Sequence, residues 1–302
     1  MTGTVLILGA TGRFGRAAGI AFARAGWQVR RFQRQGDDLD MAARGADVIV
    51  NGWNPPYPDW ARLVPGLHAQ VIRAAKAAGA TVIVPGNVYV FGPDAGTPWS
   101  AQTPHLARNP LGRIRIDMEA AYRASGVRTI LLRAGDFIDT ERSGNWFDAM
   151  LVKSVASGRV SYPGDPDVPH VWAWLPDMAR ACVLLAERRE SLPTFADIPF
   201  PGHTLTGQDL TAAIARVMPH PVRLTRMAWW PLQLARPVWP MAAGLIEMRY
   251  LWSLPHRLDG AHFAELLPDF RATPLEVAMA RAVPGASVQG QIDPDQTVPA
   301  GS

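Results

Sequence analysis

The chain has 302 residues, of which 48% are hydrophobic and 19% are charged. This balance is typical of a globular protein and excludes a chain that is disordered over its whole length. The formal net charge is +4, but 28 of the 30 cationic residues are arginine and no run of five basic residues occurs, so we expect no nucleic-acid surface. Because Cys182 is the single cysteine, a disulfide framework and a cysteine-rich metal site are excluded.

The first elements come in the order strand, glycine-rich loop, helix. Thr4–Leu8 is a continuous apolar run of strand length, which is typical of a parallel strand buried on both faces. Residues 9–15 (GATGRFG) follow at once, and we expect a helix over residues 14–25, ended by Gly26. This is the order in which dinucleotide-binding domains arrange these three elements.

The glycines of the loop have separate tasks in such a domain. Gly9 permits a tight turn, Gly12 lets the backbone approach a pyrophosphate, and Gly15 lets the helix pack against the strand. The N-terminus of the helix then offers free N–H groups and a partial positive charge to the phosphates. The expected cofactor contacts in the loop are Gly9, Thr11, Gly12, Arg13, Phe14 and Gly15.

Strands and helices continue to alternate up to about residue 133. Further strands are expected over residues 27–32, 47–51, 81–84 and 127–132, and further helices over residues 59–78 and 112–125. Strict alternation predicts a parallel sheet with helices on both faces. Asn51 and Trp53 lie just beyond the end of one of these strands, where such sheets bind ligands, so we expect them to contact the cofactor on its nicotinamide side.

The alternation ends in the second half of the chain. Prolines become frequent, seven of the eleven tryptophans lie between Trp146 and Trp252, and the expected helices 176–188 and 206–218 are irregularly spaced. We therefore predict a dinucleotide-binding domain over residues 1–140. A smaller mixed α/β substrate lobe is predicted over residues 141–282, from which a strand at 194–198 returns to the main sheet. Residues 283–302, rich in Gly, Pro, Ser and Gln, are predicted to form a disordered tail.

Residues 227–252 are the one segment that suggests a membrane. They are apolar and rich in tryptophan, but three prolines, Arg236 and Glu247 interrupt them, whereas a spanning helix needs about 20 mostly apolar residues. We expect no membrane span and predict a wall or lid of an apolar pocket, with contact to a membrane surface as the lesser alternative. The N-terminus lacks the layout of a signal peptide, so we expect a cytoplasmic protein.

Arginines near the loop favour NADP(H) over NAD(H). Domains that prefer NAD usually carry an Asp or Glu at the end of the second strand, whereas residues 1–36 contain six arginines and no acid. A guanidinium group presents a planar fork to phosphate oxygens, so we predict that Arg13 and Arg34 hold the 2′-phosphate. The alternative is that these arginines only solvate the ends of the helix and strand.

Several segments resemble the extended short-chain dehydrogenase/reductase superfamily, to which NAD-dependent epimerase/dehydratase-like proteins belong. The segments that carry the resemblance are the loop at 9–15, the acidic turn at 36–40, the strand at 46–50, the nicotinamide-side segment at 133–137 and the stretch at 170–179. The resemblance covers about residues 1–280 and implies a Rossmann-type doubly wound parallel sheet with a smaller C-terminal substrate lobe. It also implies cofactor contacts from Asp38, Leu39, Ala134, Gly135 and Phe137.

The superfamily's catalytic Tyr-x-x-x-Lys pair is missing. None of the five tyrosines is followed four residues later by lysine; Leu111 and Arg115 stand at the expected positions, and Asn87 replaces the accompanying serine. The resemblance therefore implies an atypical member. Arg115 can still bind the nicotinamide ribose or a phosphate, but an arginine does not shuttle protons. Tyr89, in the loop over the expected nicotinamide site, is the candidate proton donor, with Asn87 orienting the substrate oxygen. The alternative for Tyr89 is a buried structural hydroxyl.

Two functions of different classes fit these features. The first is an NADP(H)-dependent oxidoreductase or epimerase/dehydratase-like enzyme that acts on a small, partly apolar substrate. The second is a non-catalytic dinucleotide sensor that resembles the NmrA-type members and binds a protein partner. A membrane-surface or assembly factor is a third possibility, and a homo-oligomer is compatible with the sequence. The seven histidines never pair at ligand spacing, so we predict no metal.

Overall fold

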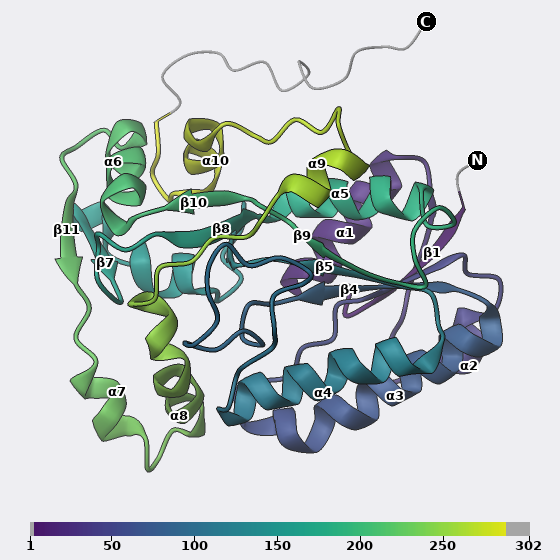
Figure 1. Cartoon of the computed structure of the whole chain (residues 1–302). Helices are drawn as coiled ribbons and strands as arrows, with labels where there is room; N and C mark the ends of the chain where they lie inside the picture. The colour runs from purple at the N-terminus through teal and green to yellow at the C-terminus, as the bar shows by residue number, and fades with distance from the viewer. Residues whose placement is uncertain (1–2, 288–302) are drawn as a thin grey trace, which may run out of the picture.

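A six-stranded parallel sheet forms the centre of the computed structural model, which describes residues 3–287 (Figure 1). The strands lie in the order β2-β1-β3-β4-β5-β9, and every pairing is parallel. Their bounds are β1 Thr4–Leu8, β2 Gln28–Arg31, β3 Val48–Asn51, β4 Thr81–Gly86, β5 Thr129–Arg133 and β9 Phe195–Pro199. The order runs outward from β1 in both directions, which confirms the predicted doubly wound sheet.

Helices cover both faces of this sheet. The helices α2 (Leu39–Ala43), α3 (Trp60–Ala78) and α4 (Pro110–Ser125) pack side by side below it in Figure 1, whereas α1 (Arg13–Arg24) packs against α5 (Leu175–Glu187) on the other face. The sequence grouped α5 with the substrate lobe. It lies on the main sheet because nine of its thirteen residues are buried, among them Leu175, Met178 and Cys182 in the core shared with α1.

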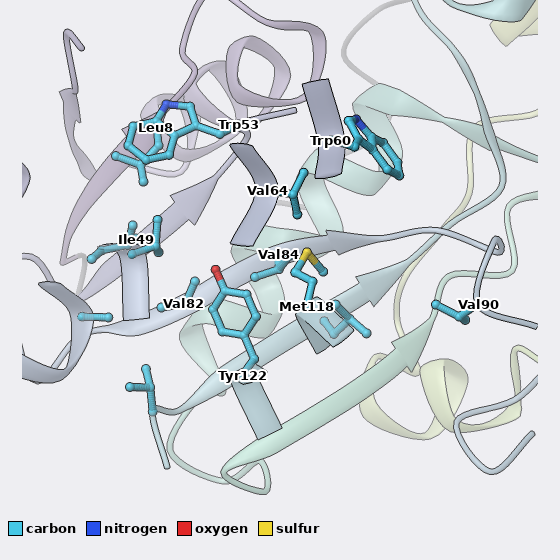
Figure 2. Packing of buried hydrophobic residues seen from close by; sticks show 14 of the residues in the cluster. Leu8, Ile49, Trp53, Trp60, Val64, Val82, Val84, Val90, Met118 and Tyr122 are labelled. Carbon is cyan, nitrogen blue, oxygen red and sulfur yellow. The ribbon is translucent and has the colours of Figure 1, made fainter. Parts of the chain in front are cut away.

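The alternation of side chains along β1 divides the core in two. Leu6 and Leu8 face α3 and α4, where they join a cluster that includes Trp60, Met118 and Tyr122 (Figure 2). Val5 and Ile7 face the opposite side and pack in the cluster of α1 and α5. A strand buried on both faces has to be apolar throughout, which is why the sequence shows an unbroken apolar run here.

The remaining elements build the substrate lobe around a third hydrophobic cluster. Its strands are β6 Asp136–Ile138, β7 Arg159–Tyr162, β8 His170–Trp174, β10 His203–Leu205 and β11 Arg223–Arg226, in two small sheets ordered β10-β8-β6 and β11-β7. Its α-helices are α6 Gly207–Val217, α7 Trp230–Ala235, α8 Pro240–Glu247 and α10 Leu275–Ala282. A short π-helix at Phe147–Leu151 and short 3-10 helices at Val155–Ser157 and Met248–Trp252 join them. The helix α9 (Ala261–Leu266) packs on β9.

The element bounds differ from the predicted ones by a few residues at most. The helix α4 begins at Pro110, two residues before the predicted start, because proline is well suited to a first helical turn. Of the predicted tail, Val283 is buried and the Ser287 N–H donates to the Val217 carbonyl, whereas residues 288–302 lie outside the described residues. Within residues 3–287, no helix is long and apolar enough to cross a membrane.

Candidate functional site

The loop at residues 9–15 leaves backbone N–H groups free at the start of α1. Gly9 has φ +70°, and the Gly12 N–H donates to the Gly9 carbonyl at 2.9 Å, which closes the turn. Gly12 is the N-cap residue and provides no side-chain cap, and the first helical bond runs from the Arg16 N–H to the Gly12 carbonyl at 2.9 Å. The three N–H groups before Arg16 therefore remain available to an anion, together with the positive end of the helix dipole.

Close backbone contacts explain why glycines occupy this loop. A Cβ atom on Gly15 would clash with the Gly9 carbonyl oxygen, and one on Gly52 would lie 2.8 Å from the Leu8 carbonyl oxygen and 3.1 Å from the Gly15 nitrogen. The loop, α1 and the segment after β3 thus meet backbone to backbone. We call Gly9, Gly12, Gly15 and Gly52 the glycine cradle. Its shape and its free donors fit a pyrophosphate, and the contribution of Gly52 was not singled out from the sequence.

The two arginines predicted to hold a 2′-phosphate contact different partners. The Arg13 Nη2 group donates to the Ser143 carbonyl at 2.9 Å, which ties α1 to the chain after β6. The guanidinium carbon of Arg34, an exposed residue, lies 4.9 Å from the ring centre of Trp53. Trp53 in turn packs edge to face on Phe32 at 5.6 Å. Of these two arginines, Arg34 is therefore the one whose guanidinium is exposed to solvent, just beyond the end of β2.

The carboxylates of Asp37 and Asp38, which follow β2, accept hydrogen bonds from backbone N–H groups. The Asp37 Oδ2 atom accepts from the Gln33 N–H at 2.6 Å, and the Asp38 Oδ1 atom accepts from the Met41 N–H at 2.8 Å, which caps α2. A carboxylate that already accepts from the backbone is a poorer partner for ribose hydroxyls. The third acid of the turn at 36–40, Asp40, pairs with Arg73 at 3.1 Å, so each of the three carboxylates already has a partner within the protein.

Two predicted cofactor contacts have their side chains in the core below the sheet. Asn51 is 1% exposed, and its Nδ2 group lies 3.2 Å from both the His68 Nδ1 atom and the Tyr122 hydroxyl. Leu39 is buried in the same cluster. Burial, together with the smaller effect of the charge of Arg115, lowers the pKa of His68 to about 3, so His68 is neutral and can accept a hydrogen bond. These side chains support the strand ends and do not point into the glycine cradle.

Two tyrosines meet at the C-terminal edge of the sheet. The hydroxyl oxygens of Tyr57 and Tyr89 lie 2.5 Å apart, and the Tyr89 ring stacks on Trp60 at 6.2 Å. Burial raises the pKa of Tyr57 to about 12 and that of Tyr89 well above its usual range, so both phenols hold their protons near neutral pH. Asn87 shapes this loop, because its Oδ1 atom accepts from the Tyr89 N–H at 3.1 Å.

Arg115 lies where the superfamily's lysine is expected, but its side chain is buried. Its Nη2 group donates to the Pro85 carbonyl at 2.7 Å, and its guanidinium carbon lies 5.8 Å from the ring of Trp60. Burial lowers the pKa of Arg115, against the opposing charge of Glu119. The side chain thus connects α4 to the end of β4, next to the loop that carries Tyr89.

A buried ion cluster supports the same loop from behind. Arg133, which is fully buried, donates to Glu119 on α4 at 2.7 Å, to Asp197 on β9 at 2.6 Å and to the Asn87 carbonyl at 2.6 Å. The two carboxylates outweigh the cost of burial and raise the pKa of Arg133. Ligand atoms of His105, Glu119 and Asp197 lie within 4.8 Å of one another, but the guanidinium supplies the positive charge between the carboxylates. An aspartate inside the apolar strand at 194–198 was the only sequence signal of this cluster.

The segment at 133–137 brings Asp136 to the same edge. A Cβ atom on Gly135 would clash with the Val171 carbonyl oxygen, so this glycine lets β6 run against β8. The Asp136 Oδ2 atom lies 2.8 Å from the His170 Nε2 atom, and the His170 ring stacks flat on Trp252 at 4.3 Å. This pair was not predicted as a unit. The Ala134 N–H donates to the Gly86 carbonyl, and Phe137 packs towards the core of α1 and α5.

The helix α8, from the apolar segment 227–252, closes one side of this region. A Cβ atom on Gly244 would lie only 2.7 Å from the ring of Tyr57, so the helix sits directly on that side chain. The Glu247 Oε1 atom accepts from the Asn109 Nδ2 group and the Leu111 N–H, each at 2.7 Å, which ties α8 to the start of α4.

Comparisons with solved structures identify proteins of the same architecture. MoeE5, in complex with UDP-glucose and NAD, matches with a TM-score of 0.71 at 16% identity over 93% of this chain and 97% of its own. The UDP-glucose 4-epimerase of Brucella ovis, in complex with NAD, matches with a TM-score of 0.69 at 17% identity over 95% and 99%. TunA, an NAD-dependent NDP-hexosamine 5,6-dehydratase, matches with a TM-score of 0.69 at 13% identity over 93% and 97%.

At these identities the likeness shows the fold. The coverage extends through the C-terminal lobe, so the whole predicted architecture, and not only the sheet, has counterparts in solved proteins. No family model and no curated protein matches the chain.

Proposed function

We propose that the chain is a nicotinamide-dinucleotide-dependent oxidoreductase or epimerase/dehydratase-like enzyme that acts on a small, partly apolar substrate. The glycine cradle carries this proposal, because it combines the free N–H groups of a helix N-terminus with a loop whose glycines carry no side chains. Solved structures of the same fold, such as that of the Brucella ovis epimerase, contain bound NAD. Bound at the cradle, the cofactor would supply the hydride donor or acceptor.

Tyr89 is the residue that we assign to proton donation. Its phenol stays protonated near neutral pH, and the Tyr57 hydroxyl at 2.5 Å offers it a partner that can return a proton. The Asn87 Oδ1 atom is used by the Tyr89 N–H, which leaves its amide N–H groups to orient a substrate oxygen. The helix α8 and Trp60 exclude water from this side of the tyrosine pair.

We further propose a preference for NADP(H), carried mainly by Arg34. Its guanidinium is exposed beside Trp53, and the carboxylates of Asp37 and Asp38, which follow β2, already accept from backbone N–H groups. Loss of a charge-assisted contact to phosphate is expected to weaken binding by roughly 10-fold or more. Arg34→Ala should therefore raise the Kd for NADPH in a fluorescence titration while leaving the Kd for NADH nearly unchanged.

The control for this titration is Arg24→Ala, at the far end of α1, where the side chain is also exposed. It should leave both dissociation constants unchanged. Equal affinity of the unmodified protein for NADPH and NADH would overturn the preference but not dinucleotide binding.

A non-catalytic dinucleotide sensor is the second candidate. The replacement of the Tyr-x-x-x-Lys pair by Leu111 and Arg115 favours it, because Arg115 is buried against the Pro85 carbonyl and the pKa of Tyr89 is well above its usual range. Incubation with NADPH and a panel of carbonyl compounds, followed by absorbance, and incubation with NAD⁺ and UDP-glucose, followed by chromatography of the sugar nucleotide, separate the two candidates. The second reaction needs product analysis because an epimerase or dehydratase returns the hydride to its substrate and leaves the absorbance unchanged. Tight cofactor binding without turnover on any compound would support the sensor.

A further inference from the structure

The helix α7 and the turn after it expose four large hydrophobic side chains. Trp230 is 67%, Leu234 71%, Val238 84% and Trp239 46% exposed. Trp230 and Leu234 are four residues apart in α7, which places them on one face of the helix, and Val238 lies in the turn that follows. We call these four residues the α7 patch. The other large exposed hydrophobics of residues 3–287 are Ile20, Met41 and Leu106, which lie on three separate segments.

The charged residues between positions 223 and 249 are nearly all cationic. Arg223, Arg226, Arg236 and Arg249 are all exposed, and no lysine occurs between them. Glu247 is the only acid between residues 223 and 249, and its carboxylate already accepts from Asn109 and Leu111. The segment that carries the patch therefore combines exposed apolar side chains with exposed arginines.

The patch lies at a projecting corner of the molecule. In Figure 1 α7 and α8 occupy the lower left, away from the central sheet, so a broad flat surface can approach them without meeting the sheet. The two helices contact each other, and α8 rests on Tyr57. The pair of helices α7 and α8 would thus make the contact at the patch and also line one side of the proposed substrate site.

We propose that the α7 patch docks on the surface of an anionic lipid bilayer. Tryptophan favours the boundary between apolar chains and headgroups, and both ends of the patch carry one. Leu234 and Val238 would lie on the apolar side, and the four arginines would face lipid phosphates. A second copy of this chain fits less well, because a two-fold contact would set the same arginines of two molecules against each other.

Sedimentation of the full chain with vesicles tests this proposal. Vesicles of phosphatidylcholine mixed with phosphatidylglycerol should bind the protein, phosphatidylcholine alone should bind it much more weakly, and added salt should weaken the binding. The double variant Trp230→Ser, Leu234→Ser should reduce binding to the anionic vesicles roughly 10-fold or more. The variant Ile20→Ser, which removes an exposed hydrophobic residue from α1, should bind as the unmodified chain does.

Three results would overturn the proposal. They are absence of binding to anionic vesicles, equal binding to both kinds of vesicle, and unchanged binding of the double variant. A dimer in solution that the double variant abolishes would assign the patch to a second copy instead. Thermal unfolding of the double variant checks that it is folded, which we expect because both side chains are mostly exposed. Since the assay measures binding to lipid and not turnover, its outcome is independent of the proposed enzymatic function.

Discussion

At the scale of single residues, burial determines which direction of proton transfer suits Tyr89, the proposed proton donor. A tyrosine that acts as a base needs a lowered pKa, whereas burial raises the pKa of Tyr89 well above its usual range and that of Tyr57 to about 12. The phenol is thus suited to give a proton to a carbonyl oxygen as charge develops there, and not to start by taking one. This direction fits reduction of a carbonyl better than oxidation of an alcohol.

The variant Tyr89→Phe tests this role. It removes the hydroxyl and keeps the stacked ring, so turnover should fall by about 100-fold or more, while the Kd for the cofactor should stay the same. The rate of NADPH oxidation with the best carbonyl substrate is the measurement. Tyr162→Phe is a matched control, because the Tyr162 hydroxyl is buried without a hydrogen-bond partner among the described residues. Unchanged turnover in Tyr89→Phe would remove this residue from the mechanism.

At the scale of elements, the Arg133 cluster joins three parts of the fold at one point. Arg133 belongs to β5, Glu119 to α4 and Asp197 to β9, and the guanidinium also holds the Asn87 carbonyl of the loop after β4. A buried charge of this kind is costly unless all its partners are present. The cluster therefore fixes the register between the sheet edge and the helix behind it, and it positions the loop of Tyr89.

Glu119→Gln should destabilise the protein by about 3 kcal/mol, because it leaves Arg133 with one buried carboxylate instead of two. The control is Asp40→Asn, which breaks an ion pair to Arg73 in which the two side chains are 61% and 44% exposed. We expect its effect to stay below about 1 kcal/mol. The free energy of unfolding in urea measures both. Equal losses in the two variants would show that the cluster gives no more stability than a surface pair.

At the scale of the whole molecule, buried neutral histidines make stability depend on pH. Burial lowers the pKa of His68 and that of His256 to about 3, from the value of 6.5 that the unfolded chain would show. His105 and His203 are shifted in the same direction. Between these pH values the unfolded state binds protons that the folded state does not. The stabilisation is therefore complete above about pH 6.5 and is lost as the pH falls towards 3.

These two histidines should make the free energy of unfolding decrease by up to about 2.7 kcal/mol per pH unit between roughly pH 6 and 4.5, since each contributes at most about 1.4 kcal/mol. In His68→Gln, whose amide oxygen can still accept from Asn51, the slope should fall by up to about 1.4 kcal/mol per unit. His262→Gln serves as the control, because the His262 side chain is 49% exposed. Urea titrations at several pH values measure the slopes. A slope that His68→Gln leaves unchanged would contradict a neutral buried His68.

Much of the fold could be predicted because its signals are local. The apolar run of β1 and the glycines that end α3 and α4 act within a few residues, and the structure places these elements close to the predicted bounds. The site could be predicted only in part. Asn51 follows a strand end as expected, but its amide turns into the core because His68 and Tyr122, from two different helices, offer it partners there. The sequence around Asn51 does not indicate that His68 and Tyr122 are its hydrogen-bond partners.

By itself, the sequence determined the strand, loop and helix that form the glycine cradle, because a turn with positive φ and a close helix contact require glycine at set spacings. Only the tertiary structure decided which groups surround that cradle. Arg13 reaches Ser143 across 130 positions of the chain, and Arg133 meets Glu119 and Asp197 from opposite sides. Such contacts depend on how whole elements pack, and the free energy of a buried charge depends on every neighbour at once. The loop therefore indicates a dinucleotide, whereas the tyrosine pair, the ion cluster and the exposed corner at α7 emerge from the packed fold.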